Sequence, residues 1–310
     1  MTDNAFVRTI VPIALLIGAG FSSRKMGFLK RGDERVLSAY LYYFALPALF
    51  FVNMAELDCN EEVIRYMAAG VTPVFVALIL LVILYLILRF STNTLYLLII
   101  STIFGSLAFF GIPFIMFAFP TREAEHLATL ASATISTVIV IISITILELY
   151  KLGEATLGEG LKLVARRLSR NPLIASILLG TLLSFSGIEI PALLSTPLHM
   201  LGGTTATVAI FMLGVFLYGR KYTNIALALG LSFLRILFLP LIALLTTNFF
   251  RMASVERSTL VLMHGTPIAI SMIVLSERYN FFKETIASLI LISSIGAGLY
   301  LNLWLLVLSR

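Results

Sequence analysis

Long apolar stretches separated by short polar segments make up most of the chain. A helix needs about 20 predominantly apolar residues to cross the hydrocarbon core of a bilayer. Ten stretches approach or exceed this length, which predicts an all-α polytopic membrane protein with ten transmembrane helices. The predicted spans are Phe6 to Ser22, Val36 to Met54, Tyr66 to Leu88, Leu95 to Phe119, Leu127 to Leu149, Pro172 to Ile190, Met200 to Leu217, Ile225 to Phe249, Leu260 to Leu275 and Thr285 to Leu308.

Two of these spans contain the same interruption, a glycine two residues before a proline. Gly111-Ile112-Pro113 lies in the fourth span, and Gly265-Thr266-Pro267 lies in the ninth, 154 positions later in a chain of 310. Proline removes a backbone donor and clashes with the preceding turn, while glycine lets the chain turn, so each helix is expected to open there. Opened backbone is tolerated at membrane depth only inside protein or beside a water-filled cavity. The two breaks therefore predict a shared substrate site.

Further matches indicate that the chain is an internal repeat. At a fixed offset of 160 the matched pairs are Pro12 with Pro172, Gly20 with Gly180 and Gly27 with Gly187. Five spans in each half is an odd number, so the two halves would insert in opposite directions. The predicted organisation is a first five-helix repeat over residues 1–150, a cytoplasmic linker over 151–170 and a second, inverted five-helix repeat over 171–310. Helices 4 and 9 are expected to be broken and to cross.

The charge distribution predicts an orientation in the cell membrane. Hydrophobic residues make up 59% of the chain and charged residues 12%, with a mean hydropathy of +1.02. Most of the 22 Lys and Arg residues fall on one side if the first loop is cytoplasmic, and both termini are then extracytoplasmic. The opposite side receives an acidic loop with Glu56, Asp58, Glu61 and Glu62. Cys59, the only cysteine, lies in that loop, so a membrane-impermeant maleimide should label it from outside. This bias accounts for the net charge of +6 without nucleic-acid binding.

Several motifs, taken in order along nearly the whole chain, resemble those of the auxin efflux carrier family. These are Leu46-Pro47-Ala48-Leu49-Phe50, Gly111-Ile112-Pro113, Asn171-Pro172-Leu173-Ile174, Gly187-Ile188-Glu189-Ile190-Pro191, Pro267-Ile268-Ala269 and Glu277-Arg278-Tyr279. The resemblance implies an architecture similar to that of bile-acid/sodium symporters and sodium/proton antiporters, with crossed, interrupted fourth and ninth helices. It also implies export or import of a small organic anion such as auxin, malate or malonate. Ser106 and Ser271 stand where the family often has asparagine.

Arg235 is the charged residue that the pattern places deepest in the bilayer. It lies about ten residues into the eighth span, roughly 15 Å from the end of the helix at 1.5 Å per residue. The 16 Asp and Glu residues fall in loops or at span ends, with Glu148 and Glu189 closest to the core. The partners of Arg235 are expected to be either backbone carbonyls freed at the breaks or an anionic ligand. His264 is expected to be neutral and hydrogen-bonded, with proton coupling as the alternative.

These observations predict a secondary transporter of a small organic anion that works by alternating access. The chain carries no catalytic or nucleotide-binding motif, so we expect no enzymatic activity, cofactor or metal. Two alternatives stay open, a sodium-coupled symporter with sodium held by freed carbonyls and a membrane-embedded ligand sensor. The expected partners are the substrate and the lipid bilayer, with a homodimer left open. The predicted substrate-binding residues are Ser106, Gly111, Pro113, Arg235, His264, Gly265, Thr266, Pro267 and Ser271.

Overall fold

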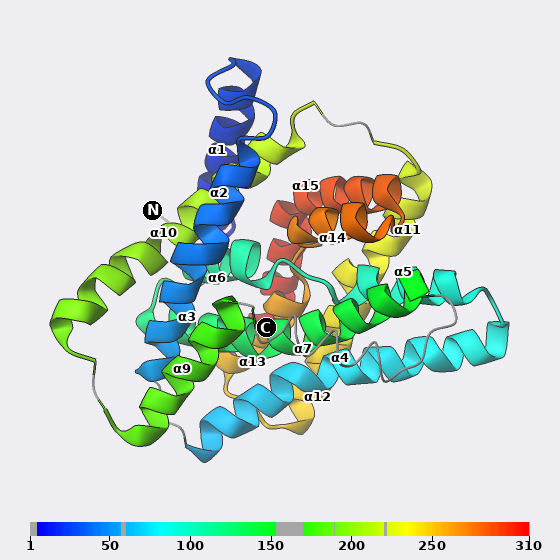
Figure 1. Cartoon of the computed structure of the whole chain (residues 1–310). Coiled ribbons are helices and arrows are strands. Elements are labelled where there is room, and N and C mark those ends of the chain that lie inside the picture. Colours follow the sequence, from blue (N-terminus) through cyan, green and yellow to red (C-terminus); the bar gives the residue numbers. More distant parts are fainter. Residues whose placement is uncertain are drawn as a thin grey trace. The chain divides into compact units, whose positions relative to one another are not determined.

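The computed structural model describes residues 5–56, 60–152, 170, 172–188, 190–219 and 222–309. The predicted linker over 151–170 and Cys59 fall largely or wholly outside the described residues, as does Glu189. Helices account for the regular structure of the described part, and its β pairing is a single isolated bridge. The α-helices are α1 (Ala5–Lys25), α2 (Glu34–Tyr40), α3 (Leu46–Ala55), α4 (Glu61–Leu88), α5 (Thr92–Ile103), α6 (Ile112–Ala118), α7 (Arg122–Leu152), α9 (Pro172–Ser186), α10 (Ala192–Leu217), α11 (Ile225–Phe233), α12 (Leu239–Phe249), α13 (Ser254–His264), α14 (Ser271–Tyr279) and α15 (Lys283–Leu308) (Figure 1).

The prediction of an all-α polytopic membrane protein is confirmed by the length and composition of these helices. Six helical segments in the described residues are long and apolar enough to cross a bilayer. They are Glu34–Ala55, Glu61–Leu88, Arg122–Lys151, Ala192–Leu217, Ile225–Phe249 and Lys283–Leu308. The predicted fourth span is divided into shorter helices and so is the ninth. Ten spans in two inverted repeats stay a prediction.

Three π-helical segments each end two residues before a proline. They are η1 (Leu41–Ala45), η2 (Leu107–Gly111) and η3 (Leu234–Phe238), which precede Pro47, Pro113 and Pro240. A proline in an α-helix lacks the donor for the carbonyl four residues back and collides with it. The wider π turn moves that carbonyl away, so the helix bends without opening.

This local geometry corrects the expected position of the first break. Gly111 and Pro113 lie at the junction of η2 and α6, where the chain stays helical. The residues outside a helix are 104–106, several positions earlier. The reason is that the π turn before Pro113 accommodates the proline, so the helix has no need to open there.

The chain folds into two compact units, each of which draws on both halves of the sequence. Unit 1 comprises Met1–Arg65, Ala108–Ala133 and Arg170–Arg220, and unit 2 comprises Tyr66–Leu107, Thr134–Ser169 and Lys221–Arg310. The two predicted five-helix repeats are consecutive in sequence and are therefore not the same divisions as these units. The repeat boundaries stay a prediction.

In unit 1, α1 packs along α10 and α3 packs along α9 (Figure 1). Glycines allow close backbone approach at both contacts. A Cβ atom on Gly20 would lie 2.0 Å from the carbonyl oxygen of Phe211, and one on Gly180 would lie 2.5 Å from that of Phe51. The two glycines that the sequence offset paired are thus both helix-packing positions.

A small substitution at the α1–α10 contact is expected to destabilise the protein. In Gly214→Ala the new Cβ would lie 2.0 Å from the carbonyl oxygen of Ile17, so the helices must separate. Overpacking of this kind costs about 1–3 kcal/mol. Gly18→Ala is the matched control, because a Cβ at Gly18 meets no atom within 4 Å. The control should melt at or slightly above the wild-type temperature in detergent. Equal melting temperatures for the two variants would contradict the packing described.

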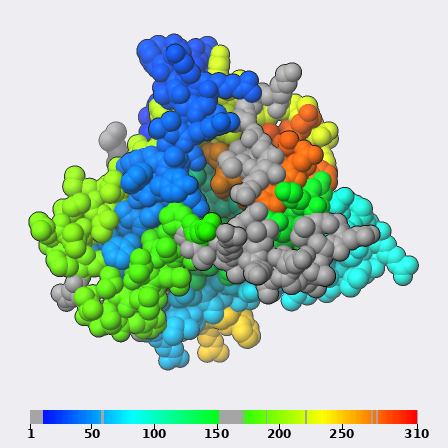
Figure 2. Space-filling view, viewed as in Figure 1, coloured from blue at the N-terminus to red at the C-terminus, as the bar shows by residue number. Residues whose placement is uncertain are grey.

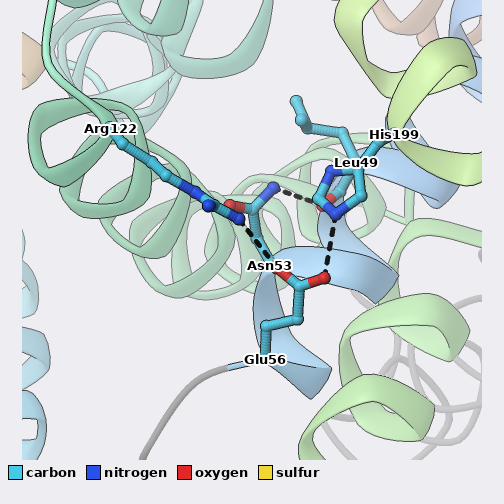
Figure 3. Close-up of polar contacts among 5 residues, drawn as sticks. All are labelled: Leu49, Asn53, Glu56, Arg122 and His199. Carbon is cyan, nitrogen blue, oxygen red and sulfur yellow. Dashed lines mark hydrogen bonds and ion pairs between the residues drawn. The ribbon is translucent and has the colours of Figure 1, made fainter. Parts of the chain in front are cut away.

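Polar contacts join three helices of unit 1 around Glu56, which follows α3 (Figure 3). Its carboxylate lies 2.8 Å from Nε2 of His199 in α10 and 3.8 Å from Nη2 of Arg122, the first residue of α7. Asn53 donates to the carbonyl of Leu49 within α3 at 2.9 Å. Because these ion pairs are exposed to solvent, each adds about 0–1 kcal/mol to stability. They lie where the predicted acidic loop begins, at Glu56.

In unit 2, α11 packs on α15 and α12 packs on α13. The indole Nε1 of Trp304 donates to the carbonyl of Ile236 at 2.8 Å and ties α15 to η3. The C-terminal half of α4, cyan in Figure 2, lies at the surface with many large apolar side chains exposed. Such a face suits contact with lipid tails. These exposed residues include Ile79, Leu80, Val82, Ile83, Leu84, Leu86, Ile87 and Leu88.

Candidate functional site

Two interrupted helical segments of unit 2 are joined through their backbones. α5 ends at Ile103 and α13 ends at His264, and an antiparallel bridge pairs Gly105 with Ile268 between them. The amide of Ser106 donates to the carbonyl of Pro267 at 2.7 Å, and the amide of Ala269 donates to that of Phe104 at 3.1 Å. Backbone groups released from helices in a dry interior need partners. Here the two breaks supply partners for each other.

The guanidinium of Arg235, in η3, lies at this junction and is fully buried. Nε donates to the carbonyl of Thr266 at 2.7 Å, and Nη1 donates to the carbonyls of Thr102 and Ile103 at 2.9 and 3.1 Å. Nη2 donates to Oγ1 of Thr266 at 2.8 Å and to the carbonyl of Met263 at 3.5 Å. An arginine has five N–H hydrogens. All five therefore have an acceptor within the protein.

The acceptors of Arg235 belong to the C-terminal ends of α5 and α13. Such ends carry partial negative charge because their last carbonyls lack helical partners. A buried cation between two of them offsets that charge. The sequence left two kinds of partner open for Arg235, freed carbonyls or an anionic ligand. In the structure, carbonyl oxygens surround the guanidinium.

Glu148, a buried carboxylate of unit 2, pairs with a tyrosine rather than with Arg235. Within the described residues, no carboxylate forms an ion pair with Arg235. Glu148 is buried near the end of α7, where its carboxylate accepts a hydrogen bond from the hydroxyl of Tyr279. The positive charge of Arg235 is therefore met by backbone dipoles rather than by an acidic side chain.

Gly105 belongs to this site and was missed in the sequence. A Cβ atom on Gly105 would lie 1.6 Å from Nη2 of Arg235 and 2.8 Å from Oγ1 of Thr266. Only glycine therefore leaves room for the guanidinium in this arrangement. The available signal was a glycine six residues before Gly111 in the fourth span, but nothing in the sequence paired it with Arg235.

His264, the last residue of α13, is fully buried and bonded to α4. Its Nε2 lies 2.8 Å from the carbonyl oxygen of Gly70. Since a carbonyl only accepts hydrogen bonds, Nε2 carries the proton. Nδ1 is buried and has no hydrogen-bond partner among the described residues. A proton on Nδ1 would be a buried, unsatisfied charged donor, so this geometry fits the neutral histidine that the sequence suggested.

A Gly-x-Pro break that starts a new half-helix would place a positive N-terminus beside each motif, but the helix end near the second motif is a C-terminus. Gly265 caps the C-terminus of α13, and the next N-terminus is that of α14 at Ser271. The helix end beside Gly265 and Pro267 is thus negative rather than positive, because the chain leaves the helix ahead of the proline instead of starting one there. In the first half, Gly111 is the last residue of η2 and α6 follows it directly, so no free helix N-terminus lies beside Gly111 and Pro113 either.

The predicted substrate-binding residues fall into three groups. Arg235, Thr266 and Pro267 come together with the backbone of Ser106 at the junction, next along the chain to His264 and Gly265. Ser271 begins α14 and is exposed. Gly111 and Pro113 are buried residues of unit 1. The junction itself is therefore built entirely within unit 2.

Comparisons with known proteins agree with the membrane character of the chain. The model of the membrane transport protein family matches residues 5–305. The chain is similar to the uncharacterized transporter YfdV of Escherichia coli strain K12, with 24% identity over 97% of each chain. It is also similar to the uncharacterized transporter MJ1031 of Methanocaldococcus jannaschii, with 22% identity over 95% of this chain and 96% of the relative.

Proposed function

Because this chain belongs to the membrane transport protein family, the family of the auxin efflux carriers, we propose that it is a secondary transporter of a small organic anion. The family assignment confirms the resemblance seen in the sequence motifs and makes the chain a multi-pass membrane transporter. The class of substrate and the alternating-access mechanism are our proposals.

The buried charge of Arg235 is the observation that carries the choice of an anion. In the described part of unit 2 it is met by backbone carbonyls rather than by an acidic side chain. Carbonyl dipoles carry no net charge, so the unit positive charge of Arg235 still acts on its surroundings. At 10 Å and an effective dielectric constant of about 20, a unit charge attracts a carboxylate by roughly 1.7 kcal/mol. The same charge repels an amine. The region around the junction should therefore favour anions.

The groups that would contact the anion lie at the two breaks. The hydroxyls of Ser106 and Ser271 are donors on the broken segments, whereas the predicted donor Thr266 already donates its hydroxyl hydrogen to the carbonyl of Met263 at 2.8 Å. Ser271 lies at the N-terminus of α14, where partial positive charge favours a carboxylate. Gly111 and Pro113, which belong to unit 1, stay predicted substrate-binding residues. In this proposal Arg235 supplies long-range attraction, and these groups supply contact.

Two features of the fold support alternating access between inverted repeats. The chain forms two compact units, which is what rigid-body movement of one part against another requires. In unit 1, the contact of the first predicted span with the seventh is repeated as a contact of the sixth with the second. An inverted repeat that equates span 1 with 6 and span 2 with 7 predicts this exchange. We further propose that both termini are extracytoplasmic, from the charge bias of the loops.

Proteoliposome flux measurements test the proposal. Purified protein should carry a radiolabelled dicarboxylate or aromatic carboxylate, and an amine of similar size should neither be carried nor compete. Protein-free liposomes provide the background. Uptake of amines or neutral solutes with no response to any carboxylate would refute the anion assignment. Carboxylate binding without flux would instead favour the ligand sensor, and flux that requires sodium would favour the sodium-coupled symporter.

A further inference from the structure

We infer that the oxygens around Arg235 form a cation site that the chain fills permanently with its own guanidinium. The inference builds on the proposed function in one respect: a site already filled needs no sodium ion, so anion transport should not depend on sodium. The existence of the site itself is independent of what the protein transports.

The chemistry of the surrounding atoms is that of a cation site. Four carbonyl oxygens, from Thr102, Ile103, Met263 and Thr266, and the hydroxyl oxygen of Thr266 point at one position. Hard cations bind such sets of oxygens. In transporters with discontinuous helices, freed carbonyls and the C-terminal ends of half-helices hold the coupling cation. Here the ends of α5 and α13 are arranged in this way, and a side chain supplies the charge.

The guanidinium leaves no room for a second cation among these oxygens. Each of its five N–H hydrogens is directed at one of them, so their inward-facing positions are occupied. The absence of a side chain at Gly105 gives the planar group just enough space, because a Cβ there would lie 1.6 Å from Nη2. An added sodium ion would also be repelled by the fixed charge. The arginine therefore acts as a resident cation that cannot dissociate.

Removing the arginine should expose the vacant site to cations from solution. Arg235→Ala should melt well below the wild type, and low millimolar guanidinium should raise its melting temperature in a saturable way. Sodium should do the same more weakly, because it lacks the planar set of donors. Choline at equal ionic strength should have no effect. The wild type should show none of these responses, because its site is filled.

Arg257→Ala is the matched control within unit 2. Arg257 lies in the first turn of α13 and donates from Nη1 to the side chain of Asn248 at 3.3 Å, and its guanidinium has no backbone carbonyl acceptor among the residues that the structure describes. Its removal should give no guanidinium response. A guanidinium response of Arg235→Ala no larger than that of this control would overturn the inference, as would a melting temperature of Arg235→Ala equal to that of the wild type.

Wild-type protein supplies a test that survives even if Arg235→Ala does not fold. A coupled cation typically changes ligand affinity by about 5–150-fold. Replacing sodium by choline should therefore change the affinity of the wild type for its carboxylate by less than about 5-fold. A larger change would overturn the resident-cation role. If cations rescue Arg235→Ala but no anion is ever transported, the cation site stands and the proposed function falls. If an anion is transported but cations do not rescue Arg235→Ala, the proposed function stands and the cation site falls.

Discussion

Gly105→Ala is expected to abolish transport and to lower the stability of the protein by more than about 3 kcal/mol. The new methyl group would lie 1.6 Å from Nη2 and 2.3 Å from Cζ of Arg235, so the guanidinium must leave its carbonyl partners. Overpacking alone costs about 1–3 kcal/mol. Each charged hydrogen bond that is lost adds about 1.5–3 kcal/mol, and the released carbonyls stay buried. Thermal melting and proteoliposome flux of the same preparation measure both effects.

Gly230→Ala provides the control for this substitution. Gly230 lies in α11 of the same unit, and a Cβ there meets no atom within 4 Å. The control should fold, transport and melt as the wild type does, or slightly better because alanine favours helix more than glycine. A Gly105→Ala protein that behaves like this control would show that the guanidinium does not occupy the position described.

Arg235→Met and Arg235→Lys should separate the charge of the arginine from its hydrogen bonds. Methionine removes both, so Arg235→Met should lose about 3–5 kcal/mol of stability, as expected when one partner of a buried charged contact is deleted. In the fraction that folds, affinity for carboxylates should fall roughly tenfold, from the loss of a unit charge at about 10 Å. Lysine retains the charge but has three donors and no planar fork.

Arg235→Lys should therefore keep carboxylate affinity within about threefold of the wild type while recovering only part of the melting temperature. Carboxylate affinity and melting temperature, measured on the wild type, Arg235→Met and Arg235→Lys, separate the effect of the charge from that of the hydrogen bonds. An Arg235→Met protein that melts like the wild type but no longer binds carboxylates would mean that the arginine contacts the anion directly. Unchanged binding in both variants would instead limit the arginine to a structural role.

The sequence predicted the helices more completely than it predicted the junction. Apolar stretches long enough to span a bilayer give most of the helices, because hydrocarbon allows few alternatives for an uninterrupted apolar segment. It also predicted that the fourth and ninth spans are interrupted, and freed carbonyls were one of the two kinds of partner expected for Arg235. It placed the first break at Gly111 and Pro113, whereas the non-helical residues are 104–106. A π turn before a proline has no distinct sequence signal, so that difference was not foreseeable.

Gly105 and Gly70 show why the rest of the site could not be predicted. Gly105 matters because of the Arg235 guanidinium, and Gly70 because its carbonyl accepts from His264. Both relationships join residues more than a hundred positions apart. Glycine has no side chain whose chemistry would indicate the contact in the sequence, and glycines are common in membrane helices for reasons of packing alone. Only the folded backbone identifies which glycine adjoins which polar group.

The pairing of α1 with α10 also delays the assembly of unit 1 during synthesis. The ribosome completes α1 at Lys25 but begins α10 only at Ala192, roughly 170 residues later. At 5–20 residues per second this interval lasts roughly 8 to 34 s. During it, the face of α1 around Gly20 lacks its α10 partner and is exposed to lipid or to the insertion machinery. Unit 1 is thus assembled late in synthesis, from helices already in the bilayer, and a chain truncated before α10 cannot complete it.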